Sequence, residues 1–322
     1  MRKAGCLGLI VAAALGLSAL YVLRTWGGPG PAEQNMTVVI KDGSSLTGAA
    51  RTLEQAGAIR SADLFLTFAK LLGDDAPIQS GEYRIPKGMS ASDVLKMLQG
   101  GKTLQRFVTV PEGMPSILVH EKLMAEKLLT GTVEIPAEGS VLPDSYSFER
   151  GEPRAAVLKR MQAAMTKKLD ALWAARKPTS AVSSPREAII LASIVEKETG
   201  VPSERRMVAS VYSNRLRTGM KLQADPTVIY PVTKGKPLGR RILRSELNAQ
   251  NGYNTYAMAG LPAGPIANPG AESIAAVLDP EQSRALYFVA DGSGGHVFAE
   301  TLSQHNANVQ KWYALRRAKG EM

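Results

Sequence analysis

The clearest periodic pattern in the chain runs from Ser184 to Gly200, SPREAIILASIVEKETG. Its apolar residues recur every three or four positions, which predicts an amphipathic helix with one buried face. Ser184 suits the N-cap, Pro185 suits the first helical position, and Glu187 completes a capping box by reaching back to the cap. Gly200 suits the C′ position. The sequence therefore predicts a helix whose two ends are both marked.

Two glutamates near the end of this helix point in different directions. At about 100° per residue, Glu198 shares a face with the apolar Ile194, whereas Glu196 points about 200° away from Glu198. The two carboxylates are therefore not a pair. Glu198 is the better catalytic candidate, because a carboxyl group desolvated among apolar side chains keeps its proton near neutral pH. The alternative is a helix-end residue that reaches water or pairs with Arg205 or Arg206.

The longest apolar run is AGCLGLIVAAALGLSALYVL, which follows Arg2 and Lys3. It approaches the roughly 20 apolar residues of a membrane helix, so we expect an anchor over residues 5–25. The positive charges ahead of it place residues 1–4 in the cytoplasm and the rest of the chain outside. The expected location is thus the cell inner (plasma) membrane, with a single pass. A cleaved signal peptide is the alternative, although no clear A-x-A site is followed by polar sequence.

A Gly/Pro-rich linker is expected over residues 26–35, and a small module over residues 36–103. Strands are predicted at MTVVI and within GEYRI, and each helix between and after them begins at a small polar cap. The expected caps are Ser44 or Ser45, Ser61, and a serine of the MSAS segment. This order of strands, turns and helices is similar to LysM-like glycan-binding folds, although other small α+β domains share it.

Residues 104–322 are expected to form a mixed α+β catalytic domain, so the predicted fold class of the chain is α+β. Strand and helix patterns alternate there without a repeat of solenoid length. The expected elements are a strand at 105–110, helices at 117–129 and 153–176, a loop at 138–151, and a helix capped by Ser203 that ends near Gly219.

Three blocks after Gly219 are rich in Asn, Tyr, Thr, Gly and Pro: LQADPTVIY, YNTYAMAGLPAGPIANPG and LYFVADGSGGHVFAETLSQHN. Planar amides and aromatic faces suit a groove that binds a hydroxyl-rich ligand such as a sugar. The alternative is a set of ordered turns in which Asn and Asp bond their own backbone. The candidates for holding such a ligand are Asp225, Tyr253, Asn254, Tyr256, Asn268 and His296.

Charge and composition narrow the chemistry. Lys+Arg 39 against Asp+Glu 29 gives a formal charge of +10, which suits an anionic polymer or a membrane surface. No RNA-recognition or zinc-finger pattern is present, so we expect no nucleic-acid partner. Cys6, the only cysteine, lies in the apolar run, and the three histidines form no HExxH. We therefore expect neither a metal nor a cofactor. There is no G-x-S-x-G motif of a serine hydrolase either.

Five blocks in order, LASIVEKET, LQADPTVIY, YNTY, GLPAGPIANPG and YFVADGSGGHVF, resemble the YceG-like family of endolytic murein transglycosylases. The resemblance implies a membrane-anchored enzyme that cuts nascent peptidoglycan strands internally at the MurNAc-GlcNAc bond. It implies products with 1,6-anhydro-MurNAc ends, and the second glutamate of EKET, Glu198, as the catalytic acid. Gly200, Ala224 and Ala263 depart from residues that are frequent in the family. Ala263 puts the fit of the substrate loop in question.

The implied reaction agrees with a single catalytic carboxyl group. A lytic transglycosylase uses the C6 hydroxyl of the substrate as the nucleophile, whereas a glycan hydrolase needs a second carboxylate at a set distance. That hydrolase remains the alternative enzyme, and a non-catalytic cell-wall binding or division scaffold protein remains the alternative outside enzymes. The expected partners are nascent glycan strands, the membrane and, by family analogy only, the peptidoglycan synthases of elongation or division.

Overall fold

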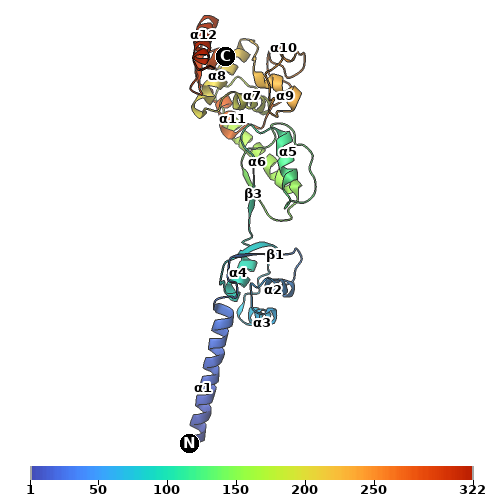
Figure 1. Cartoon of the computed structure of the whole chain (residues 1–322), viewed down its shortest axis with the longest axis vertical. Coiled ribbons are helices and arrows are strands. Elements are labelled where there is room, and N and C mark those ends of the chain that lie inside the picture. The colour runs from blue at the N-terminus through green and yellow to red at the C-terminus, as the bar shows by residue number, and fades with distance from the viewer. Residues whose placement is uncertain (1, 321–322) are drawn as a thin grey trace. The chain divides into compact units, whose positions relative to one another are not determined.

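A computed structural model describes residues 2–320, with side chains from residue 12 onward. The chain divides into two compact units. The first contains the residues up to Arg106 together with Phe148–Gly151, and the second contains Phe107–Ser147 and the residues from Glu152 onward. Helices predominate in both, and the strands form two-stranded sheets (Figure 1). The predicted α+β class is confirmed.

The described chain begins with helix α1 (Arg2–Val22), the long blue helix of Figure 1, and a π-helical turn, η1 (Leu23–Gly27). Among the described residues, none of the helices combines the length and the hydropathy of a membrane span. The predicted anchor at 5–25 lies in part on residues 2–11, whose side chains fall outside the description. The anchor therefore stays a prediction.

The rest of the first unit has the predicted order of elements. Strands β1 and β2 pair antiparallel, with Val38 opposite Tyr83. Serine hydroxyls cap the three helices as expected: Ser45 accepts from Gly48 N, Ser61 from Leu64 N and Ser90 from Asp93 N. The elements are β1 (Met36–Ile40), α2 (Leu46–Gln55), α3 (Ala62–Leu72), β2 (Gly81–Ile85) and α4 (Ala91–Gly100).

The stretch at 26–35, predicted as a linker, packs against this unit. The Trp26 ring is buried against Phe65 and Phe68, with centroids 5.8 and 5.9 Å away. Beyond it, Gly30 N donates to the carbonyl of Gly88, whose own N–H donates to the carbonyl of Ala32, at 3.0 and 2.9 Å. Burial of a large indole and these backbone bonds hold the segment in place, a long-range effect that its Gly/Pro composition does not reveal.

The second unit is built around helix α7. Its neighbour α11 packs against both α7 and α8, and α6 and α9 also contact α7 (Figure 1). The elements are β3 (Arg106–Thr109), α5 (Ser116–Ala125), β4 (Ser145–Phe148), α6 (Arg154–Ala174), α7 (Pro185–Glu198), η2 (Pro202–Glu204), α8 (Arg205–Arg217), α9 (Asp225–Thr233), α10 (Arg244–Leu247), α11 (Ala271–Leu278), β5 (Tyr287–Ala290), β6 (His296–Ala299) and α12 (Leu302–Ala318).

The start of α7 follows the prediction. Ser184 Oγ accepts from Glu187 N at 3.2 Å, and Pro185 is the first helical residue. The carboxylate of Glu187 reaches back one residue beyond the cap and accepts from Ser183 N at 2.7 Å. These bonds satisfy donors that the first helical turn leaves free, so the entry to the catalytic candidate's helix is fixed.

The predictions for the end of α7 and the start of α8 are wrong in detail. The helix stops because Thr199 turns to an extended conformation, with φ −136° and ψ 132°, and not because Gly200 becomes left-handed. The hydroxyl of Thr199 accepts from Val201 N at 3.0 Å and so closes the turn locally. The 3-10 turn η2 then leads into α8, so Ser203 caps no helix.

Candidate active site

A cavity of about 380 Å³ opens where α7 ends. Glu198, the last residue of α7, lies in its wall together with residues of α8, α9, the first strand of the β5–β6 hairpin, and α12. The lining residues are Glu198, Tyr212, Arg215, Gln223, Asp225, Tyr256, Tyr287, Phe288, Leu302 and His305. Polar and aromatic groups thus surround one carboxyl group.

The preceding turns of α7 carry Glu198 on a helix that is buried on every side. Residues 188–195 are all buried, so the helix cannot shift without disturbing the core. Glu198 Oε1 is itself buried and has no hydrogen-bond partner among the described residues. The carboxyl group is therefore desolvated yet adjacent to an open cavity.

This environment raises the pKa of Glu198 to about 7. Burial is the main cause, and the negative charge of Asp225 adds to it. Hydrogen bonding from the Tyr212 side chain and the positive charge of Arg215 partly oppose the increase. A carboxyl group with a pKa near 7 can donate a proton and then take one back at neutral pH, as acid–base catalysis requires.

Tyr212 and Arg215 approach the carboxyl group from α8. They stand three positions apart and so share a face of that helix. Both are buried, and Arg215 is fixed by bonds from its Nε to the Leu286 carbonyl and from its Nη1 to the Leu222 carbonyl, at 2.7 and 2.5 Å. Neither residue is among those predicted from the sequence for the site. A local pattern does not reveal this role, because the Leu286 carbonyl that holds Arg215 lies more than seventy positions later in the chain.

Asp225 and Tyr256, two of the predicted ligand-binding residues, do meet in this cavity. The Tyr256 hydroxyl donates to Asp225 Oδ1 at 2.6 Å. The backbone just before Asp225 is held in an unusual shape, since Gln223 has a φ of 52° and its N–H donates to the Thr255 carbonyl at 3.2 Å. A non-glycine residue in this conformation beside a cavity is typical of a constrained binding site.

The other four predicted residues are not among those that line the cavity. Asn254 is fully buried, and its amide nitrogen donates to the carbonyls of Leu247 and Ala249 at 2.9 and 2.8 Å. Asn268 is also fully buried: its Oδ1 accepts from Val141 N at 3.0 Å. Asn254 therefore bonds the backbone of its own loop, whereas Asn268 joins its loop to a segment far away in the chain.

Tyr253 and His296 have other neighbours. Tyr253 packs against Tyr230 with ring centroids 5.0 Å apart. His296 Nδ1 lies 2.8 Å from Glu204 Oε2, on the strand that pairs with the cavity wall. Direct contact of either residue with a ligand stays a prediction.

The remaining charged groups near the helix end are accounted for. Glu196 is not among the cavity residues and accepts from Gly270 N at 2.9 Å, next to the start of α11. Arg205 pairs with Glu112 at 3.0 Å and Arg206 with Asp279 at 3.2 Å. Each of these two arginines thus has another carboxylate as its partner, and the arginine that faces the Glu198 carboxyl group is Arg215.

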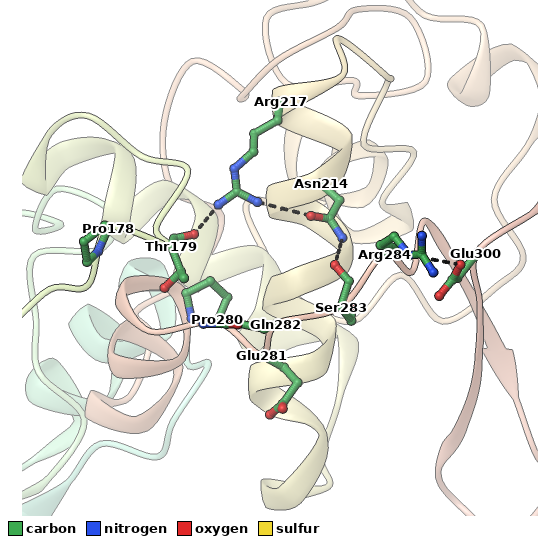
Figure 2. Close-up of a pocket in the computed structure, with 10 residues that line it drawn as sticks. All are labelled: Pro178, Thr179, Asn214, Arg217, Pro280, Glu281, Gln282, Ser283, Arg284 and Glu300. Carbon is green, nitrogen blue, oxygen red and sulfur yellow. Dashed lines mark hydrogen bonds and ion pairs between the residues drawn. The ribbon is translucent and has the colours of Figure 1, made fainter.

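A second hollow, of about 630 Å³, lies beside the Asn214 and Arg217 side of α8 (Figure 2). Two of its arginines are held in place: Arg217 binds Asn214 and the Thr179 carbonyl, and Arg284 pairs with Glu300 at 3.5 Å. Across the described residues 2–320, no cluster of histidine, cysteine and acidic side chains is arranged to hold a metal ion.

The sequence of the chain is similar to those of known proteins. The chain is 28% identical over 316 residues to an endolytic murein transglycosylase of Bacillus subtilis, covering 88% of this chain and 86% of that protein. It is 29% identical to one of Streptococcus pneumoniae, covering 85% of this chain and 58% of that longer protein.

A solved structure agrees. The crystal structure of a putative YceG-like protein from Listeria monocytogenes is similar, with a TM-score of 0.52 and 28% identity. The match covers 86% of this chain and 99% of that one. The model of the YceG-like family matches residues 38–311, which include every residue that lines the cavity. With most of its length matched, the chain belongs to the YceG-like family.

Proposed function

We propose that this protein is an endolytic lytic transglycosylase that cleaves the MurNAc-GlcNAc bond of nascent peptidoglycan strands and leaves 1,6-anhydro-MurNAc ends. The observation that carries the proposal is the Glu198 carboxyl group, desolvated at the end of α7 and open to a cavity, with its pKa raised to about 7. The names of the bacterial relatives supply the polymer.

The reaction needs two proton transfers, and one carboxyl group performs both. Protonated Glu198 donates to the glycosidic oxygen as the bond from that oxygen to MurNAc C1 breaks, which releases the GlcNAc 4-hydroxyl group. The Glu198 carboxylate then takes the proton of the MurNAc C6 hydroxyl while the C6 oxygen bonds to C1. No water is consumed, and Glu198 ends protonated as it began.

Asp225 and Tyr256 are proposed to hold the sugar next to Glu198. Their hydrogen bond fixes the Asp225 carboxylate at the cavity, where it can accept from sugar hydroxyls and face the positive charge that develops at C1. Tyr253 is a proposed contact farther along the strand, whereas Asn254, Asn268 and His296 are proposed to support the segments that carry such contacts.

The presence of Asp225 also favours a second candidate function, glycan hydrolysis. With Glu198 as the acid, a second carboxylate in the same cavity supplies what a hydrolase needs, either as a nucleophile or as a base for water. The family relationship favours the transglycosylase, and the products separate the two.

The test is an assay of new reducing ends on purified, uncrosslinked glycan strands. A transglycosylase shortens the strands without new reducing MurNAc, whereas a hydrolase produces one for each cut. Asp225→Asn distinguishes them further: it slows a transglycosylase, which loses a charge that faces C1 but keeps Glu198 and the C6 hydroxyl, and it inactivates a hydrolase, which loses its nucleophile or base. New reducing MurNAc ends in step with shortening would contradict the proposal.

Anchoring and partners complete the proposal. We propose that residues 5–25 hold the protein in the inner membrane with the catalytic unit outside, and that the module at 36–103 binds glycan as LysM-like folds do. Synthases of elongation or division, which make the substrate, are proposed partners. The full chain is expected to sediment with membranes and to stay bound to them when they are washed with high salt.

A scaffold without catalysis instead predicts that Glu198→Gln leaves strand lengths in cells unchanged.

A further inference from the structure

The β5–β6 hairpin forms one wall of the cavity, because Tyr287 and Phe288 both line it. The entry to the hairpin is tied to α8: Asn214 Nδ2 donates to the carbonyls of Ser283 and Ala285 at 2.9 and 3.0 Å, and Figure 2 shows the first of these bonds. The other strand, β6, is held by a different residue, Glu204.

Glu204 receives hydrogen bonds from two parts of the chain. Its Oε1 accepts from the backbone N–H of His296 at 2.8 Å, and its Oε2 lies 2.8 Å from His296 Nδ1. The same Oε2 accepts from the hydroxyl of Thr199 at 3.3 Å. Burial raises the pKa of Glu204, but the hydrogen bonds from His296 outweigh it and lower the pKa, so the acceptor is a carboxylate.

Thr199 and His296, the two partners of Glu204, both lie next to residues of the site. Thr199 is the residue after Glu198, and its buried hydroxyl closes the turn that ends α7. The His296 ring packs edge-on against Phe288, with centroids 5.1 Å apart, and Phe288 packs edge-on against Tyr212 at 5.9 Å. Glu204 therefore connects the end of the catalytic helix to the wall opposite it.

The Glu204 carboxylate lies close to the backbone of the hairpin. A Cβ atom on Gly295, the residue before His296, would lie 2.6 Å from Glu204 Oε1. The carboxylate thus sits directly against the hairpin backbone, and a larger residue at 295 would force the end of the Glu204 side chain to move.

We propose that Glu204 is a positioning residue: through His296 and Thr199 it fixes the distance between Glu198 and the Tyr287–Phe288 wall. His296 acts through Glu204 and not by touching the glycan. This inference rests on the proposed function, since the distance that it fixes is the width of the site for the sugar. A reacting group displaced by about 1 Å loses on the order of a hundredfold in rate.

The experiment compares four variants of the full chain in the glycan-strand assay. Glu204→Gln turns an amide donor toward the donors of His296, and His296→Ala removes the ring. His296→Asn keeps a side-chain N–H near the place of Nδ1. Arg284→Ala, which removes an exposed ion pair beside the hairpin, is the matched control.

Glu204→Gln and His296→Ala are expected to lower kcat by roughly tenfold to a hundredfold with a smaller change in KM. His296→Asn is expected to recover most of the loss, and Arg284→Ala to resemble the wild type. Hydrogen exchange should be faster at the amides of 287–299 in Glu204→Gln, at temperatures well below its Tm.

Three results would overturn the inference. One is a fully active Glu204→Gln with unchanged exchange. Another is a folded His296→Asn as inactive as His296→Ala, which would give His296 a direct role on the substrate. The third is a loss of activity that only follows the loss of Tm across all four variants. If the wild type made no anhydro ends, the proposed function would fail, while the exchange measurement would still test whether Glu204 holds the hairpin.

Discussion

Glu198 combines two properties that are seldom found together: it ends a helix buried on every side, and it opens to a cavity. A carboxyl group in full contact with water would be ionised at neutral pH and unable to donate a proton. One buried without access would never meet a substrate. The position at the end of α7 meets both demands, and Tyr212 and Arg215 moderate the rise in pKa that burial causes.

The pH dependence of catalysis follows from this pKa. The first step requires protonated Glu198, so kcat/KM is expected to be retained below about pH 7 and to fall by about tenfold per pH unit above it. The measurement is kcat/KM on glycan strands from pH 5 to 9, with a parallel check that the fold persists. A rate that rises through pH 7 would mean that the ionised carboxylate starts the reaction.

Tyr212 affects the pH above which kcat/KM falls. Tyr212→Phe removes the hydrogen bond that lowers the pKa of Glu198, so the alkaline limb should move to higher pH. The ring and its packing against Phe288 are kept, and the change in the free energy of unfolding should be about 1 kcal/mol. Tyr256→Phe, which removes the bond to Asp225, serves as the comparison. A limb shifted to lower pH in Tyr212→Phe would contradict the assignment.

At the scale of elements, the precise start of α7 depends on its cap. Ser184→Ala removes the hydroxyl that accepts from Glu187 N and should lower the free energy of unfolding by about 1 kcal/mol. Ser203→Ala is the matched control, because Ser203 caps neither η2 nor α8, and its effect should stay within about 0.5 kcal/mol. Equal losses in chemical denaturation would remove the role given to the Ser184 cap.

The loop that packs on α7 depends on a glycine. Gly139 has a φ of 76°, and a Cβ atom there would lie 2.6 Å from Ile189 Cγ2 of the helix. Gly139→Ala should therefore cost about 2–4 kcal/mol, from backbone strain and overpacking together. Gly131→Ala has a similar φ of 70° but open space around it, so about 1 kcal/mol is expected. Equal costs, measured by thermal unfolding, would show that the contact with Ile189 is unimportant.

Features of the helices that depend on neighbouring residues could be predicted from the sequence, whereas features that depend on contacts between distant residues could not. The start of α7 and the serine caps at 45, 61 and 90 depend on residues within three or four positions, which a sequence displays directly. The stop of α7 depends on a turn closed by Thr199, which competes with the more familiar glycine at 200. The packing of Trp26 depends on Phe65 and Phe68, about forty positions away.

The same division holds for the site. Glu198 could be found from one helix, and Asp225 and Tyr256 from their polar blocks. Asn254 and Asn268 stand in similar blocks, yet the structure uses their amides inside the loops. Arg215 and Glu204 were missed because their partners, Leu286 and His296, lie more than seventy positions later in the chain. Only the folded chain shows which polar residues reach the cavity.

At the scale of the whole molecule, the chain contains two compact units and a predicted N-terminal anchor, and the family match extends across both units. The catalytic cavity lies in the second unit, while the glycan-binding role proposed for residues 36–103 belongs to the first. The net charge of +10 suits attachment to an anionic cell-wall polymer, a contact that salt should weaken. The proposed function is defined by the glycosidic bond that the enzyme cuts and by the sugar end that this cut leaves on the strand.

Mass spectrometry of the fragments released from uncrosslinked nascent strands tests that claim most directly. The full-length wild type should yield internal fragments that end in 1,6-anhydro-MurNAc. Glu198→Gln should yield none above background while keeping the circular dichroism and Tm of a folded protein. Fragments that end in reducing MurNAc, or anhydro ends still formed by folded Glu198→Gln, would contradict the account.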